Sequence, residues 1–74
     1  MPATISLLDA QRMVLAELEQ LCRMEGSDCY TKPQWIVGNY VLTTADLIAH
    51  VRALDSIGKA FIYMWAQSHG YAVR

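Results

Sequence analysis

The chain has little charge of either sign and no concentration of one sign. Of its 74 residues, 18% are charged, six basic and seven acidic, and the formal net charge is −1. The two signs alternate along the chain, so no basic block or stripe is present to attract a phosphate backbone or an anionic membrane surface. The charge therefore disfavours nucleic acid as a partner, and we expect no membrane association.

Long uninterrupted hydrophobic runs and leader-like features are also lacking. The most apolar stretch, residues 47–66, is broken by four polar side chains, His50, Arg52, Asp55 and Lys59, too many for a membrane-spanning helix. The first residues contain no basic segment followed by an apolar one, so a secretory signal is not expected. Two cysteines are few for a small fold that depends on disulfides. We expect a soluble, cytoplasmic protein.

What the chain has in excess is hydrophobic residues, which make up 54% of it. A folded chain of 8.3 kDa exposes roughly 4,600 Å². Each of the few charged side chains would have to cover about 350 Å² of that surface, more than any of them can, even on an ordinary half-apolar surface. The composition therefore predicts that a second surface is buried against another copy of the chain or against a partner.

The first element is predicted to be a helix that begins near Leu7. Ser6 followed by Asp9 has the spacing of a helix N-cap. Apolar residues then recur on one side with a helical period, and charged residues occupy the other side. Gly26 is suited to end the helix.

A short β-hairpin is predicted to follow, because residues 34–37 and 40–43 are rich in aromatic and β-branched side chains. Gly38-Asn39 between them suits a two-residue turn with glycine in first position. Pairing across this turn places one set of alternate residues on one face, namely Trp35, Val37, Tyr40 and Leu42. The other face receives Gln34, Ile36, Val41 and Thr43.

The last segment is predicted to be helical from about Thr44 to about His69, since Thr43 and Asp46 repeat the capping pattern. The pattern favours one continuous helix of about 26 residues, or ~39 Å; a break near Gly58 is the alternative. Apolar residues recur along it at alternating spacings of four and three, which indicates a seam that packs against a second helix. We interpret this seam as the interface of a helical homodimer, formed by Leu47, Val51, Leu54, Gly58, Phe61 and Trp65.

The predicted fold is thus mainly α within the α+β class: a helix, a short β-hairpin and a long C-terminal helix in a single domain, residues 1–74. Neither cofactor nor metal is expected. The spacing of Cys22, Cys29, His50 and His69 matches no zinc pattern. The favoured interpretation of Cys22 and Cys29 is a core thiol and a loop thiol, with a disulfide between them as the alternative.

Catalysis is not expected. A nucleophile arrangement would join Cys29 to His50, with Asp46 one helical turn away orienting the imidazole. The spacing permits it, but such pairs are common on helix surfaces, and no oxyanion loop surrounds Cys29.

The hypothesis favoured by the sequence is a small protein-binding module, such as an adaptor, inhibitor or regulatory subunit, that acts as a homodimer. Its unidentified protein partner would contact Trp35, Val37, Tyr40 and Tyr63, because aromatic residues carry much of the binding energy at interfaces. One alternative is a DNA-binding regulator with a helix-turn-helix around Gly58, in which few residues could read DNA: Lys59, Tyr63, Gln67 and Ser68. The other alternative is a structural assembly component, such as a phage particle connector.

Overall fold

A computed structural model describes residues 3–74 as three α-helices, a 3₁₀ turn and four short strands. In chain order these are β1 (Ala3–Ile5), α1 (Leu7–Glu25), η1 (Ser27–Tyr30), β2 (Pro33–Val37), β3 (Tyr40–Thr43), α2 (Thr44–Ala53), α3 (Ser56–Ser68) and β4 (Tyr71–Val73). The predicted mixed class with mostly helical content is confirmed. The predicted domain also includes residues 1 and 2, which lie outside the described residues.

The first helix is confirmed at both ends. The Ser6 hydroxyl accepts a hydrogen bond from the Asp9 N–H, and the Gly26 N–H donates to the Cys22 carbonyl after the last turn. Gly26 has φ +99°, a conformation that a residue with a side chain rarely adopts. Capping residues therefore set the length of α1, as the sequence predicts.

The hairpin is also confirmed, with a buried face and an exposed face. Trp35 pairs with Leu42, and Ile36 pairs with Val41. Val37 and Leu42 belong to the core, whereas Ile36 and Val41 are 70% and 64% exposed. Gly38 has φ +60°, and Asn39 is not among the positive-φ residues, as a turn with glycine in first position requires.

The prediction of one continuous C-terminal helix is wrong, because the segment breaks at Leu54 and Asp55. Leu54 takes a left-handed conformation, with φ 52° and ψ 36°, and ends α2. The Asp55 carboxylate then caps α3 by accepting a hydrogen bond from the Gly58 N–H at 2.9 Å. The break lets α3 fold back onto the rest of the chain and does not leave a long rod exposed.

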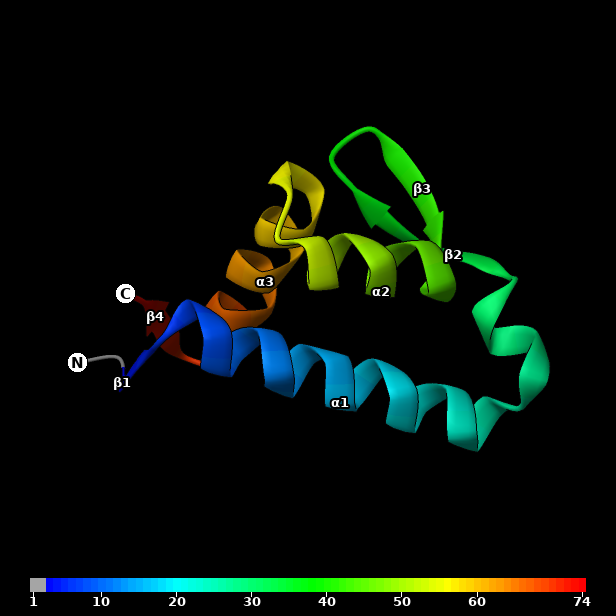
Figure 1. Ribbon diagram of the computed structural model, residues 1–74, viewed down its shortest axis with the longest axis horizontal. Coiled ribbons are helices and arrows are strands. Elements are labelled where there is room, and N and C mark those ends of the chain that lie inside the picture. Colours follow the sequence, from blue (N-terminus) through cyan, green and yellow to red (C-terminus); the bar gives the residue numbers. More distant parts are fainter. Residues whose placement is uncertain (1–2) are drawn as a thin grey trace.

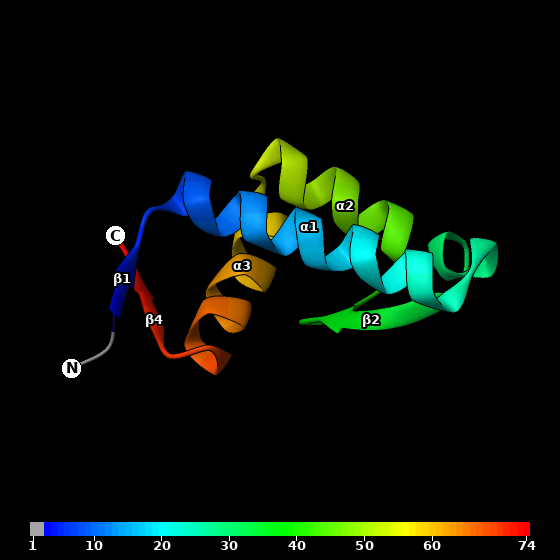
Figure 2. The same cartoon turned by 90° about the horizontal axis from the view of Figure 1, so that it is seen from below.

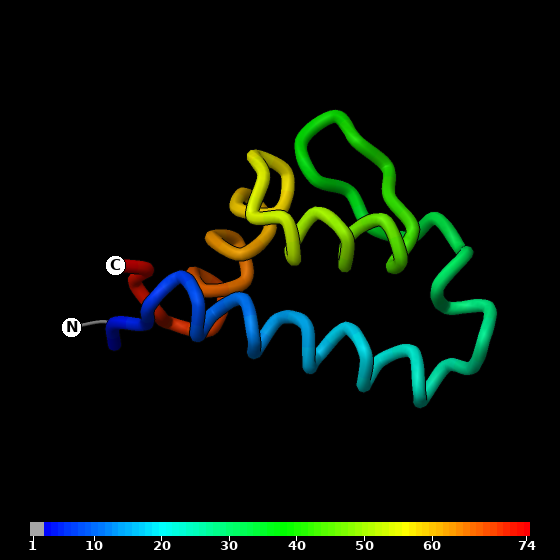
Figure 3. Tube along the Cα trace, in the orientation of Figure 1, coloured from blue at the N-terminus to red at the C-terminus, as the bar shows by residue number. Residues whose placement is uncertain are grey.

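The helices form two layers. α1 and α2 run antiparallel and side by side (Figure 1), and the path of the chain between them passes through η1 and the hairpin (Figure 3). Figure 2 shows α3 and the hairpin together on one side of the α1–α2 pair. The Gln11 side chain joins the first layer by donating to the Val51 and Arg52 carbonyls, at 3.0 and 3.1 Å. None of the helices within residues 3–74 is long and apolar enough to cross a membrane.

The two terminal strands are an element that the sequence did not predict. β1 pairs in parallel with β4, with Thr4 opposite Ala72, at the end of the molecule where both termini lie (Figure 1). The Arg74 N–H continues the ladder by donating to the Ile5 carbonyl at 3.0 Å. Each strand has three residues, and nothing local in the sequence indicates that residues so far apart pair.

The predicted dimer seam lies within the core of a single chain. Leu47 and Val51 are fully buried, and Trp65 is nearly so. Gly58 does permit a close helix contact, but the helix that approaches it is α2 of the same chain: a Cβ built on Gly58 would lie 2.0 Å from the His50 carbonyl oxygen. Because the break at Leu54 divides the seam between α2 and α3, its residues face other elements of the same chain: Gly58 packs on α2, and Phe61 and Trp65 lie opposite α1.

The interpretation of Cys22 and Cys29 as free thiols is wrong, and the alternative is found. The two residues form a disulfide with a Cα–Cα distance of 5.1 Å. Gly26 reverses the chain after α1, and η1 returns Cys29 to the end of that helix. Cys22 and Cys29 are therefore close to each other, and both are buried. The disulfide therefore joins the end of α1 to the segment that leads into the hairpin.

The cap of α3 gives the fold a pH-dependent component. The Gly58 N–H and then the His50 imidazole lower the pKa of Asp55 from its ordinary 3.8. Because the pKa is lower in the folded state, the ionised carboxylate stabilises the fold above pH 3.8. This stability is lost as the pH falls through the folded-state pKa. We expect the stability of the wild type to fall more steeply below pH 4 than that of Asp55→Asn, whose amide still caps but does not titrate. Urea unfolding at a series of pH values measures the difference; parallel curves would contradict it.

Candidate binding site

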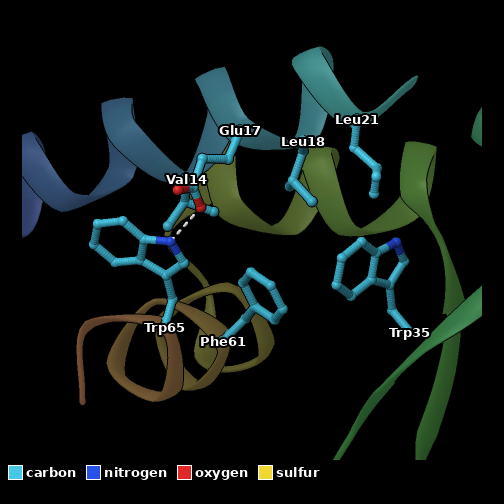
Figure 4. A pocket seen from close by; sticks show the side chains of 7 residues that line it. All are labelled: Val14, Glu17, Leu18, Leu21, Trp35, Phe61 and Trp65. Atoms are coloured by element: carbon cyan, nitrogen blue, oxygen red, sulfur yellow. Dashed lines mark hydrogen bonds between the residues drawn. The ribbon is translucent and has the colours of Figure 1, made fainter. Parts of the chain in front are cut away.

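A cavity of about 310 Å³ opens between α1, α3 and the hairpin. Its walls are apolar except for one carboxylate (Figure 4). The side chains that line it are Val14, Glu17, Leu18, Leu21, Trp35, Phe61 and Trp65. Ligand sites are commonly concave, mostly apolar and provided with a few polar groups, so this cavity is the candidate site.

α1 supplies one wall of the cavity, because four of its side chains recur at spacings of three and four and so lie on one face of the helix. Val14 and Leu18 lie in the core, with Leu21 further along the same side and Glu17 at its border. Residues at these spacings lie one above another on one face of a helix. The border position explains how a carboxylate can face an otherwise apolar cavity while about half of its side chain (54%) remains exposed.

Trp35 is held in place by a buried hydroxyl. Its indole Nε1–H donates to Thr44 Oγ1 at 2.8 Å, and the Gln34 side chain donates to the same oxygen at 3.1 Å. Cys29 Sγ lies 3.8 Å from this oxygen. Since Thr44 is fully buried in the first turn of α2, the orientation of the Trp35 ring depends on α2 and on the disulfide segment together.

Trp65 is fixed by the carboxylate of Glu17. The Trp65 Nε1–H donates to Glu17 Oε2, drawn as the dashed line in Figure 4. The other oxygen of Glu17 lies 3.7 Å from His69 Nε2. A buried indole N–H needs an acceptor, and Glu17 provides it from α1. The carboxylate and the indole thus hold α1 and α3 at a fixed distance across the cavity.

The apolar walls favour an apolar occupant over a cation, because a cation placed among them would lose its hydration. The His69 ring also stacks on the Trp65 indole at 4.5 Å, which covers one face of that indole. Trp35 and Phe61 meet edge to face, with centroids 5.5 Å apart. The cavity is therefore suited to an aliphatic or aromatic group.

A second hollow of about 340 Å³ adjoins the first and shares two of its side chains. It is lined by Phe61, Met64, Trp65 and Ser68. Phe61 and Trp65 are one turn apart on α3, so they form a ridge between the two hollows. An extended partner could place one side chain on each side of this ridge.

The Thr44 hydroxyl gives a test of how the cavity is held open. We expect Thr44→Val to lower the free energy of unfolding by about 1–2 kcal/mol, because it removes the acceptor of two partly buried donors. The indole N–H signal of Trp35 should shift strongly in a ¹H–¹⁵N spectrum, whereas that of Trp65 should not. Thr4→Val, at an exposed threonine of β1, is the control and should change neither. An unshifted Trp35 signal in Thr44→Val would contradict the assignment.

The structure separates the four residues predicted to contact a partner. Trp35 lines the cavity, and Tyr40 is exposed near the tip of the hairpin. Val37 is buried in the core and not available for contact. Tyr63 is exposed, but it comes two residues after Phe61 and hence faces roughly the opposite side of α3.

The nucleophile arrangement is not formed. Cys29 is bonded to Cys22, and the His50 Nδ1 lies 2.5 Å from the Asp55 carboxylate, so His50 does not use Asp46 as its partner. Within residues 3–74, no three histidine, cysteine, aspartate or glutamate side chains come together in a way that could hold a metal ion.

Sequence reasoning missed the part of the cavity that comes from α1, and it missed Thr44. The sequence predicts Phe61 and Trp65 in a dimer seam, because it favours a continuous helix over the break that turns these two residues toward α1. A usable signal was present: each of the two tryptophans requires a hydrogen-bond acceptor if it is buried.

Comparison of the chain with known protein families, curated protein sequences and solved structures finds no match.

Proposed function

We propose that the protein is a protein-binding module whose cavity between α1, α3 and the hairpin takes a bulky apolar side chain of a partner. The observation that carries this proposal is the cavity itself, about 310 Å³ with apolar walls and one carboxylate. Interface residues that contribute most to binding insert into desolvated pockets of this kind. An adaptor, inhibitor or regulatory subunit would act in this way.

The exposed apolar surface supports the proposal. The accessible surface is 4824 Å², close to the roughly 4,600 Å² of a compact monomer. Large apolar side chains that remain exposed within residues 3–74 are Leu8, Met13, Met24, Tyr30, Ile36, Tyr40, Val41, Tyr63 and Met64. Two of them, Ile36 and Val41, are neighbours on the outer face of the hairpin, and exposed apolar side chains that lie together often mark a surface that binds another protein.

The experiment is a titration with N-acetyl-leucinamide, a minimal apolar side chain, followed through the two indole N–H signals. We expect both signals to shift with a dissociation constant in the millimolar range, about what so small a ligand can reach. N-acetyl-serinamide should produce no saturable shift.

Leu21→Lys places a charge in the cavity wall and should abolish the shifts. The matched control is Leu8→Lys, an exposed leucine on the same helix, which should keep them. Equal shifts with the leucine and serine compounds, or unchanged shifts in Leu21→Lys, would contradict the proposal.

A DNA-binding regulator is the second candidate, because α2 and α3 are joined by only Leu54 and Asp55 at a sharp corner. Lys59, Tyr63 and Gln67 are exposed at spacings of four on α3, where a recognition helix would present them. Only one of these is basic, which is little for phosphate contacts. Salt-dependent retention on duplex DNA would favour this candidate over the first.

The homodimer stays a prediction, and we expect it to form through surface residues other than the predicted seam. Its predicted seam is occupied within one chain, so a second copy would have to use exposed side chains such as Ile36 and Val41. Light scattering on a size-exclusion peak tests it: a dimer has twice the 8.3 kDa of the chain.

A further inference from the structure

We propose that the segment bound in the cavity carries a lysine or arginine directly beside its bulky apolar side chain, and that this cation pairs with Glu17 at the cavity rim. This rests on the proposed function and adds to it the charge of the partner, which is a peptide segment of another protein chain.

Among the described residues that line the two hollows, Glu17 is the only charged one. One carboxylate oxygen is engaged by the Trp65 indole N–H, which fixes the orientation of the group. The other oxygen lies toward His69 at 3.7 Å, the only cation partner that Glu17 has within residues 3–74. A histidine is charged only when it is protonated, so the negative charge at this rim is incompletely neutralised by the chain itself.

The position of the charge specifies where the cation of a partner must lie. Glu17 lies at the edge of the apolar face of α1, with about half of its side chain in solvent. The cavity beside it is apolar. A cation placed inside the cavity would lose its hydration among apolar side chains. The favourable arrangement has the apolar group inside and the cation at the rim. An acidic residue at the same place would be repelled by Glu17.

The surface on either side of Glu17 is suited to a peptide. Met13 and Met24 lie four residues before and seven residues after Glu17, on the same stripe of α1, and both are exposed. Methionine side chains adapt to different partners because they are unbranched and polarisable. Across the cavity, the second hollow beyond the Phe61–Trp65 ridge offers a place for a further apolar side chain.

Three acetylated and amidated tetrapeptides test the inference: Gly-Lys-Leu-Gly, Gly-Glu-Leu-Gly and Gly-Lys-Ser-Gly. Each is titrated at low ionic strength into the wild type, Glu17→Gln and Glu25→Gln, and the indole signals are followed. Glutamine at position 17 retains an oxygen that can accept from Trp65 and removes only the charge. Glu25→Gln removes the same charge from the exposed end of α1, away from the cavity.

In the wild type we expect the Lys-Leu peptide to bind about fivefold more tightly than the Glu-Leu peptide, the size of one exposed ion pair gained and one repulsion avoided. The preference should disappear in Glu17→Gln, persist in Glu25→Gln and shrink in high salt. Equal affinity of the two leucine peptides for the wild type, or a preference that persists in Glu17→Gln, overturns the inference alone. Binding of the Lys-Ser peptide as tight as that of the Lys-Leu peptide overturns the proposed function as well.

Discussion

Replacing Gly58 with alanine is expected to lower the free energy of unfolding by about 3 kcal/mol, the upper part of the range for overpacking a core. The added Cβ would lie 2.0 Å from the His50 carbonyl oxygen and 2.9 Å from the Val51 nitrogen. These are backbone atoms of α2, which cannot rotate away, so the two helices must move apart. Helix propensity acts in the opposite direction by about 1 kcal/mol and does not offset the clash.

The control for Gly58→Ala is the reverse exchange two residues further along the helix. Ala60 is exposed on α3, so Ala60→Gly should cost only about 0.5–1 kcal/mol through backbone entropy. Glycine is thus preferred at position 58 and alanine at position 60. Urea unfolding of both variants measures the two effects, and a Gly58→Ala protein as stable as the wild type would show that α2 and α3 do not pack as described.

Reduction of the disulfide is expected to destabilise the fold by about 2–3 kcal/mol, the chain-entropy value for closing so short a loop. Cys22 and Cys29 are seven residues apart. The disulfide also holds the segment that leads to Gln34 and Trp35, so the cavity should loosen when the bond is opened.

Denaturation with and without a reducing agent measures this effect, and the Cys22→Ala/Cys29→Ala double variant is the control. The reducing agent should lower the stability of the wild type and leave that of the double variant unchanged. If it lowered neither, the two cysteines would be the free thiols that the sequence favoured.

The local elements could be predicted because their signals are local. Ser6 and Thr43 cap the helices that follow them, and Gly38 allows the turn of the hairpin. In each case the partner atom lies within a few residues in the sequence. Capping and turn chemistry therefore determine these boundaries whatever the rest of the chain does.

The sequence does not distinguish a break between α2 and α3 from a continuous helix, because the residue types there are compatible with both. Leu54 holds a left-handed conformation that costs about 1–2 kcal/mol for a residue with a side chain, and leucine is otherwise a good helix former. Its side chain packs against the core, which offsets that cost. Asp55 and Gly58 carried the signal for a new cap, but the apolar spacing across them continued that of one helix.

Contacts between distant residues account for most of what was missed. The pairing of β1 with β4 joins the two ends of the chain, and the disulfide depends on how η1 returns to α1. The cavity combines side chains of α1, β2 and α3, and it exists only because the break at Leu54 directs Phe61 and Trp65 toward Glu17. No periodicity within one segment reports such an arrangement.

The most direct test of the proposed binding site is an intermolecular nuclear Overhauser measurement on the complex with the Gly-Lys-Leu-Gly peptide. We expect contacts from the leucine methyl protons to the ring protons of Trp35 and Phe61 and to the methyls of Leu21. Contacts to Ile36 and Val41 on the outer face of the hairpin, without any to Trp35 or Phe61, would show that the partner binds elsewhere and would contradict the account.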